Sequence, residues 1–119
     1  MSYSAYVLTD ASRTEILRQY PPSYDTVIAH HVTYKFPDTQ PPLPHKKAMV
    51  VGYTANDRIE ALIVEIDGST RRPGGGIFHI TMSLDADMGA KPLHANALIA
   101  NDSYFDVDPF EIELTGELL

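Results

Sequence analysis

Two segments of the chain carry the same triplet of residues, a histidine, an apolar residue and a threonine. The first is His31-Val32-Thr33, within AHHVTYKF, and the second is His79-Ile80-Thr81, within FHITMSL. Both segments are rich in β-branched and aromatic residues, which favours strands. Side chains on a strand alternate between its two faces, so each triplet presents an imidazole and a hydroxyl on one face and buries its middle residue on the other.

If these strands are neighbours, six polar side chains share one face: His31, Thr33, Lys35, His79, Thr81 and Ser83. One neutral imidazole can then remove a proton from water or a ribose hydroxyl, while an imidazolium protonates the departing oxygen. The threonine hydroxyls can donate to phosphate oxygens, and Lys35 can supply positive charge where negative charge develops. This chemistry requires no metal ion and no other cofactor, so the pattern predicts metal-independent cleavage of a phosphodiester.

Paired H-h-T triplets, each on a β-strand and in the two halves of one small domain, resemble the two-histidine (2H) phosphoesterase superfamily. The resemblance implies an α+β fold, namely a small bilobal domain with pseudo-two-fold symmetry, an antiparallel or mixed sheet, a central cleft and one or two helices on the outside. It also implies that His31 and His79 form the acid–base pair and that Thr33 and Thr81 bind the phosphate. Members of the superfamily open 2′,3′-cyclic phosphates, trim RNA ends, or cleave 2′,5′-linked and cyclic oligonucleotides.

The second half of the chain departs from the pattern of this superfamily, which places a helix before the second triplet. Here residues 67–76 form the loop DGSTRRPGGG, and only 48 positions (79 − 31) separate the two histidines. We expect the helix to follow the triplet instead, within residues 91–101, where Pro92 confines its start. Arg71 and Arg72 can close over a phosphate, with the glycines at 74–76 offering backbone N–H groups; the alternative is a solvated hairpin loop.

The remaining pattern predicts one α+β domain over residues 1–119. A helix is expected at residues 11–20, capped by Thr9-Asp10 and ended by Pro21-Pro22. Residues 37–44 contain four prolines and are expected to form an extended loop. Strands are expected at residues 5–8, 26–36, 48–54, 59–66, 77–84 and 105–114.

Other residues allow competing interpretations. Alternation places His30 on the face opposite His31, so we expect a core or edge role for it. A zinc site made by His30, His31 and His79 would need ligands that converge on one point, and adjacent strand residues point apart. Tyr6 or Tyr53 can stack a nucleobase if either lines the cleft, although core packing is the simpler role. The two triplet histidines themselves can be half-buried sheet residues, with the threonines there for β-propensity.

Composition limits the classes of partner. The 119 residues include no cysteine, which excludes disulfides, thiolate nucleophiles and cysteine-based zinc sites and is typical of a reducing, cytoplasmic setting. A net charge of −7 opposes binding along duplex nucleic acid, and no apolar run is long enough for a membrane helix. The expected partner is a small nucleotide or an RNA end. There are two alternatives: a binding module that captures such a ligand unchanged, and an interaction domain. The sequence does not indicate the oligomeric state.

Overall fold

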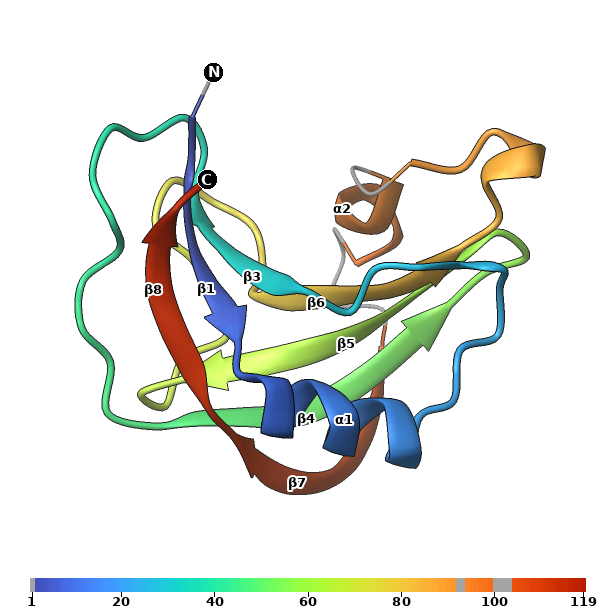
Figure 1. Ribbon diagram of the computed structural model, residues 1–119, viewed down its shortest axis with the longest axis horizontal. Coiled ribbons are helices and arrows are strands. Elements are labelled where there is room, and N and C mark those ends of the chain that lie inside the picture. Colours follow the sequence, from blue (N-terminus) through green and yellow to red (C-terminus); the bar gives the residue numbers. More distant parts are fainter. Residues whose placement is uncertain (1, 92–93, 100–103) are drawn as a thin grey trace.

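The computed structural model describes residues 2–91, 94–99 and 104–119 of the chain (Figure 1). In chain order, the elements within these residues are β1 (Ser4–Leu8), α1 (Asp10–Gln19), β2 (Thr26–Val27), β3 (His31–Lys35), β4 (Ala48–Ala55), β5 (Ile59–Ile66), β6 (His79–Leu84), the 3-10 helix η1 (Ala86–Met88), α2 (His94–Leu98), β7 (Phe105–Ile112) and β8 (Leu114–Leu118). This is the expected α+β class, and a helix does follow the second triplet. The expected start of that helix at Pro92 lies outside the described residues.

The strands form one antiparallel sheet in the order β7-β4-β5-β6-β3-β1-β8, and β2 pairs separately with β6. The two triplet strands, β3 and β6, are therefore central neighbours. Only Glu113 separates β7 from β8, so one bent segment pairs with β4 at one edge of the sheet and with β1 at the other. The sheet consequently curls into a half-barrel (Figure 1). The expected final strand at residues 105–114 is thus two strands and extends to Leu118.

The two helices pack on opposite faces of the sheet. Ile16 of α1 joins a cluster that includes Val32, Ile80 and Val50, on the inside of the curl. Ala95 and Ile99, in and just after α2, join smaller clusters on the other face, beside β5. The triplets therefore lie in a sheet that is covered on both sides. Among the described residues, no helix is long and apolar enough to cross a membrane.

Helix α1 forms as the sequence predicts. The side chain of Thr9 caps it by accepting a hydrogen bond from Ser12 N at 3.3 Å. The prolines at 21 and 22 follow directly on the last turn. Residues 37–44 are the expected loop, and this loop runs alongside β8 (Figure 1), where a Cβ added to Gly116 would lie 3.0 Å from Pro42.

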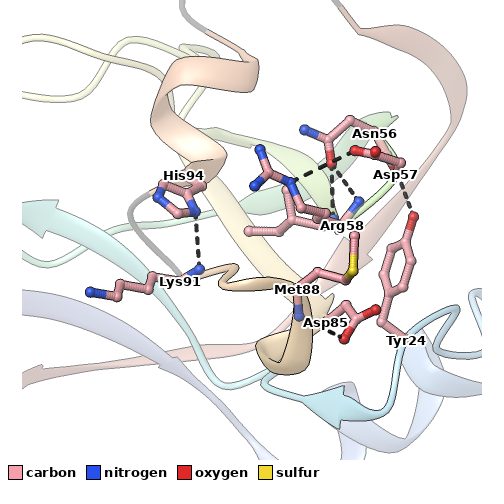
Figure 2. A network of polar contacts seen from close by, with 9 residues as sticks. Tyr24, Asn56, Asp57, Arg58, Asp85, Met88, Lys91 and His94 are labelled. Atoms are coloured by element: carbon pink, nitrogen blue, oxygen red, sulfur yellow. Dashed lines mark hydrogen bonds and ion pairs between the residues drawn. The ribbon is translucent and has the colours of Figure 1, made fainter.

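A network of polar contacts holds together the end of the sheet that leads towards α2 (Figure 2). The hydroxyl of Tyr24 donates to Asn56 O in the β4–β5 turn, and the Asn56 side chain accepts from Arg58 N at 2.9 Å. Asp85 N donates to Arg58 O at 2.8 Å, and the Asp85 side chain caps η1. The β4–β5 hairpin thus holds the chain where it leaves β6 and enters η1.

Candidate functional site

The two triplets meet across the β3–β6 pair. Val32 pairs with Ile80, and both side chains belong to the inner core. His31 and Thr33 flank Val32 and pair with Val7 and Ala5 of β1, so alternation turns both away from the inner core. His79 and Thr81 flank Ile80 in the same way on β6. The two imidazoles lie near enough for His79 to act electrostatically on His31.

A bulge interrupts the ladder where the first triplet begins. Ala29 N donates to Thr81 O at 2.9 Å, whereas Val32 pairs with Ile80. From Ala29 to Val32 the chain advances by three residues, whereas from Thr81 to Ile80 on β6 it advances by one. Residues 30–31 are therefore two extra residues that have no partner position on β6. Bulges of this kind re-aim side chains and often occur beside active sites.

The bulge changes the position of His30 from the one that regular alternation predicts. Ala29 adopts a positive φ of 43° and is fully buried, and Arg13 of α1 donates to its carbonyl oxygen at 2.9 Å. His30 is exposed, and its Nδ1 lies 3.0 Å from Nδ1 of His31. His30 is therefore not a core residue, and its ring contact with His31 contradicts the expectation that the two side chains point to opposite faces. The expected single strand at residues 26–36 is likewise two strands, separated by residues 28–30.

His31 is half-buried and has a partner at each ring nitrogen. Its Nδ1 contacts His30, and its Nε2 lies 3.3 Å from the hydroxyl of Tyr3, whose ring is tilted against it with centroids 5.6 Å apart. Burial, then the neighbouring His30 and then His79, lower the pKa of His31 from 6.5 to about 4. His31 is therefore neutral at neutral pH, as a general base must be.

His79 is more deeply buried, with 8% of its surface exposed, and Thr81 beside it is 7% exposed. Its Nδ1 lies 2.9 Å from Ile77 O; a carbonyl only accepts, so Nδ1 carries the proton. Burial lowers the pKa of His79, the hydrogen bond to Ile77 O raises it, and Arg72 lowers it further. The net direction is downward, and Nε2 is the nitrogen left to exchange a proton with a substrate.

Arg72 is the basic residue that the structure brings to the histidines. It is half-buried, which lowers its pKa, and its charge acts on His79. The loop holds it in place, since its Nε donates to Gly75 O at 3.0 Å. Arg71 is exposed, and its backbone forms a bridge with Ile77. Of the two arginines, Arg72 is thus the one whose charge is seen to act on a triplet histidine.

Lys35 departs from the position that alternation predicts. Ser4 pairs with Lys35 and Ala5 with Thr33, so one extra residue of β3 shifts the register just before Lys35. Lys35 is exposed and lines a cavity of about 490 Å³ whose other lining residues are Ser2, Pro37, Asp38 and Thr39. Neither triplet histidine lines this cavity.

Ser83 is displaced from the triplet face in the same way. Glu60 pairs with Ser83 and Ala61 with Thr81, so one residue of β6 is extra between the two pairs. The Ser83 hydroxyl is fully buried, donates to Glu60 Oε2 and accepts from Tyr24 N at 3.2 Å. Its hydrogen-bonding capacity serves this buried carboxylate.

The aromatic rings near His31 are those of Tyr3 and Phe36, and not those of Tyr6 and Tyr53, which the sequence suggested. Tyr6 belongs to the inner core and donates to Leu43 O, and Tyr53 donates to Glu60 Oε1 at 2.9 Å. These two tyrosines therefore serve packing and buried polar contacts. Tyr3 lies against His31, and the ring of Phe36 lies 5.6 Å from that of Tyr3 and is 60% exposed.

Within residues 2–91, 94–99 and 104–119, the His, Asp and Glu side chains form no group of three or more that could hold a metal ion. Comparison with known proteins adds no assignment: no protein-family model, curated protein or solved structure matches the chain. The site must therefore be interpreted from its own geometry.

Proposed function

We propose that this protein is a metal-independent phosphodiesterase that cleaves a nucleotide phosphodiester, with His31 and His79 as its acid–base pair. The observation that carries the proposal is the Val32–Ile80 pairing, which makes the two triplet strands neighbours. By alternation, the two imidazoles and the two threonine hydroxyls would share the face opposite this pair. One imidazole removes the proton from the attacking oxygen and the other protonates the leaving oxygen. Thr33 and Thr81 donate to the non-bridging oxygens.

Arg72 completes the electrostatic requirement. A phosphodiester carries one negative charge and gains more on its equatorial oxygens during attack, so a fixed guanidinium beside His79 stabilises that charge most when water is excluded. The half-buried position of Arg72 and its bond to Gly75 O support this role. Arg72 replaces Lys35 as the source of positive charge in the mechanism.

The substrate class that we propose is a 2′,3′-cyclic phosphate, including one at an RNA end, or a 2′,5′-linked or cyclic oligonucleotide. Tyr3 and Phe36 support a nucleotide over a simple phosphodiester, because exposed aromatic faces stack on bases with about 1–3 kcal/mol each. Phe36→Ala is expected to raise KM for a nucleotide roughly tenfold. Phe105→Ala provides the matched control, since Phe105 is 77% exposed on β7.

The proposal includes the bilobal arrangement of the 2H phosphoesterases. In that arrangement β1, α1 and β3 would be one half, β5, β6 and α2 would be the other, and the substrate would bind in a cleft between them. The central pairing of β3 with β6 supports this correspondence.

The decisive experiment is a hydrolysis screen in EDTA with 2′,3′-cyclic mononucleotides, 2′,5′-linked oligonucleotides and cyclic oligonucleotides. Wild type is expected to turn over one class with a bell-shaped pH profile, and His31→Ala and His79→Ala to lose on the order of 100-fold or more in kcat/KM. His45→Ala is the matched control, because His45 packs against Tyr6, a residue of the inner core. Activity that EDTA abolishes, or that survives both triplet variants, contradicts the proposal.

Capture of the ligand without turnover is the second candidate. The burial of His79 favours it, because a deeply placed acid has little access to solvent for reprotonation. No turnover of any class, together with nucleotide binding that both triplet variants weaken, would establish the capture module. Loss of both turnover and binding in wild type would leave the triplets as structural sheet residues.

A further inference from the structure

The ring contacts of His31 form a chain of three groups. Tyr3 contributes its hydroxyl at Nε2 of His31, 3.3 Å away, and His30 contributes its Nδ1 at Nδ1 of His31, 3.0 Å away. His31 is half-buried in the middle of this chain, whereas His30 is exposed to solvent. Both nitrogens of the central imidazole are thus engaged before any substrate binds.

The hydrogen-bonding chemistry selects one arrangement of protons. Two ring nitrogens at hydrogen-bond distance need one proton between them, so one Nδ1 donates and the other accepts. A phenol hydroxyl is a good donor and a poor acceptor, whereas an unprotonated imidazole nitrogen is a good acceptor. Tyr3 therefore donates to Nε2 of His31, Nδ1–H of His31 donates to His30, and the exposed His30 keeps its own proton on Nε2, where water solvates it.

His79 is held in a different way. Its Nδ1–H donates to Ile77 O, a carbonyl whose partial negative charge stabilises the doubly protonated ring. A second proton on His31 would instead lie near His30, which directly precedes β3, and near His79 of β6, with Arg72 beyond His79. The contact of His31 at Nε2 is the hydroxyl of Tyr3, which directly precedes β1. The surroundings therefore disfavour a charged His31 more than a charged His79.

We propose that His30 is a positioning residue: by accepting Nδ1–H of His31 it fixes the tautomer in which Nε2 is unprotonated, which makes His31 the base and His79 the acid. On substrate binding the attacking hydroxyl or water displaces Tyr3 from Nε2. The proton of the attacking oxygen moves to His31 Nε2 as the new P–O bond forms. The leaving oxygen receives the Nε2 proton of His79, which that ring takes up from solvent when the anionic substrate binds, as the old bond breaks. The assignment of roles rests on the proposed function, whereas the tautomer is a property of the free protein.

The test begins with long-range ¹H–¹⁵N NMR correlations of histidine rings in the free protein, in which the two tautomers of a neutral ring give distinct patterns. Wild-type His31 is expected to be Nδ1-protonated. His30→Asn places an amide oxygen where Nδ1 stood and is expected to keep this tautomer, whereas His30→Ala is expected to convert most of the population to Nε2–H. An Nε2-protonated His31 in wild type, or an unchanged tautomer in His30→Ala, overturns the proposal.

The kinetic arm uses the substrate that the hydrolysis screen identifies. His30→Ala is expected to lower the plateau of kcat/KM roughly tenfold, a part of what general base catalysis supplies, and His30→Asn to restore most of it. In both variants the acidic limb of the profile is expected to move to higher pH, because the charge of His30 no longer opposes protonation of His31. A plateau that Asn does not rescue, or a limb that does not move, overturns the positioning role. If wild type shows no turnover, the enzyme proposal fails while the NMR result still decides the tautomer.

Discussion

The burial of His31 has a thermodynamic consequence that can be measured without a substrate. Its pKa is about 4 in the folded protein, against 6.5 for an unperturbed imidazole. In the unfolded chain His31 therefore binds a proton as the pH falls below 6.5, while the folded protein resists protonation until about pH 4. Stability that is fully present above pH 6.5 is consequently lost as the pH falls through this window.

The size of the effect follows from the two pKa values. Between pH 7 and pH 5 the linkage relation gives a loss of about 1.8 kcal/mol from His31, and solvent screening at the partly exposed ring reduces this to roughly 1 kcal/mol. His79, whose pKa is also lowered, adds a loss of the same sign. Three carboxylates also have lowered pKa values: Glu15, Asp38 and Asp67. They change the free energy of unfolding mainly below pH 5, so the change between pH 7 and pH 5 comes from the histidines.

The assay is urea unfolding at pH 7 and pH 5, followed by far-ultraviolet circular dichroism, for wild type and His31→Asn. Wild type is expected to lose roughly 1 kcal/mol more than the variant between the two pH values, because the variant lacks the imidazole but keeps His79. Each protein serves as its own reference, so the static cost of the substitution cancels. Equal losses in the two proteins would refute the burial of His31 and with it the electrostatic account of the site.

Two further predictions concern the loop and the β6 bulge. A Cβ at Gly76 would lie 3.1 Å from Arg72 Nη2, so Gly76→Ala is expected to displace Arg72 and lower kcat/KM severalfold; Gly74→Ala has a similarly positive φ but no atom within 4 Å, and steady-state kinetics should show wild-type activity for it. Ser83→Ala removes a donor from the buried Glu60 carboxylate and is expected to cost about 1–3 kcal/mol in urea unfolding. It should leave kcat/KM unchanged, whereas a large loss of activity at full stability would return Ser83 to the site.

The sequence predicted the elements of this fold well because their signals are local. Thr9 caps α1, and the prolines at 21 and 22 end it, through chemistry that involves only neighbouring residues. The pairing of the two triplet strands entered the sequence argument only as a condition, because nothing local in either segment indicates its neighbour. The structure meets that condition at Val32 and Ile80.

The misplacement of Lys35, Ser83 and His30 has one kind of physical cause, which is a β-bulge in the strand that carries each residue or just before it. Alternation assumes one residue per step, and a bulge adds a residue that leaves no mark in composition. Beyond the extra residue each side chain changes face, which moved Lys35 and Ser83 away from the histidines. The two-residue bulge opposite Thr81 had the reverse effect on His30, because it brought His30 towards His31 instead of away from it.

Tyr3 was missed for a different reason. It precedes the predicted first strand, and its position depends on the pairing of β1 with β3, in which Val7 lies opposite His31 and Ala5 opposite Thr33. Continuing that face by two residues from Ala5 leads to Tyr3. The signal was therefore present in the alternation, but only an assumed strand order could have used it.

The electrostatics of the site bear on the choice between an enzyme and a capture module. Both imidazoles have lowered pKa values in the free protein, so neither is a ready acid at neutral pH. A bound phosphodiester brings a negative charge into a partly dry site and favours protonation of whichever ring holds a proton best. That ring is His79, because its Nδ1–H already donates to Ile77 O. In the enzyme that we propose, substrate binding would thus drive protonation of His79, and the same burial that slows exchange with solvent in the free protein would confine the protonated state to the complex.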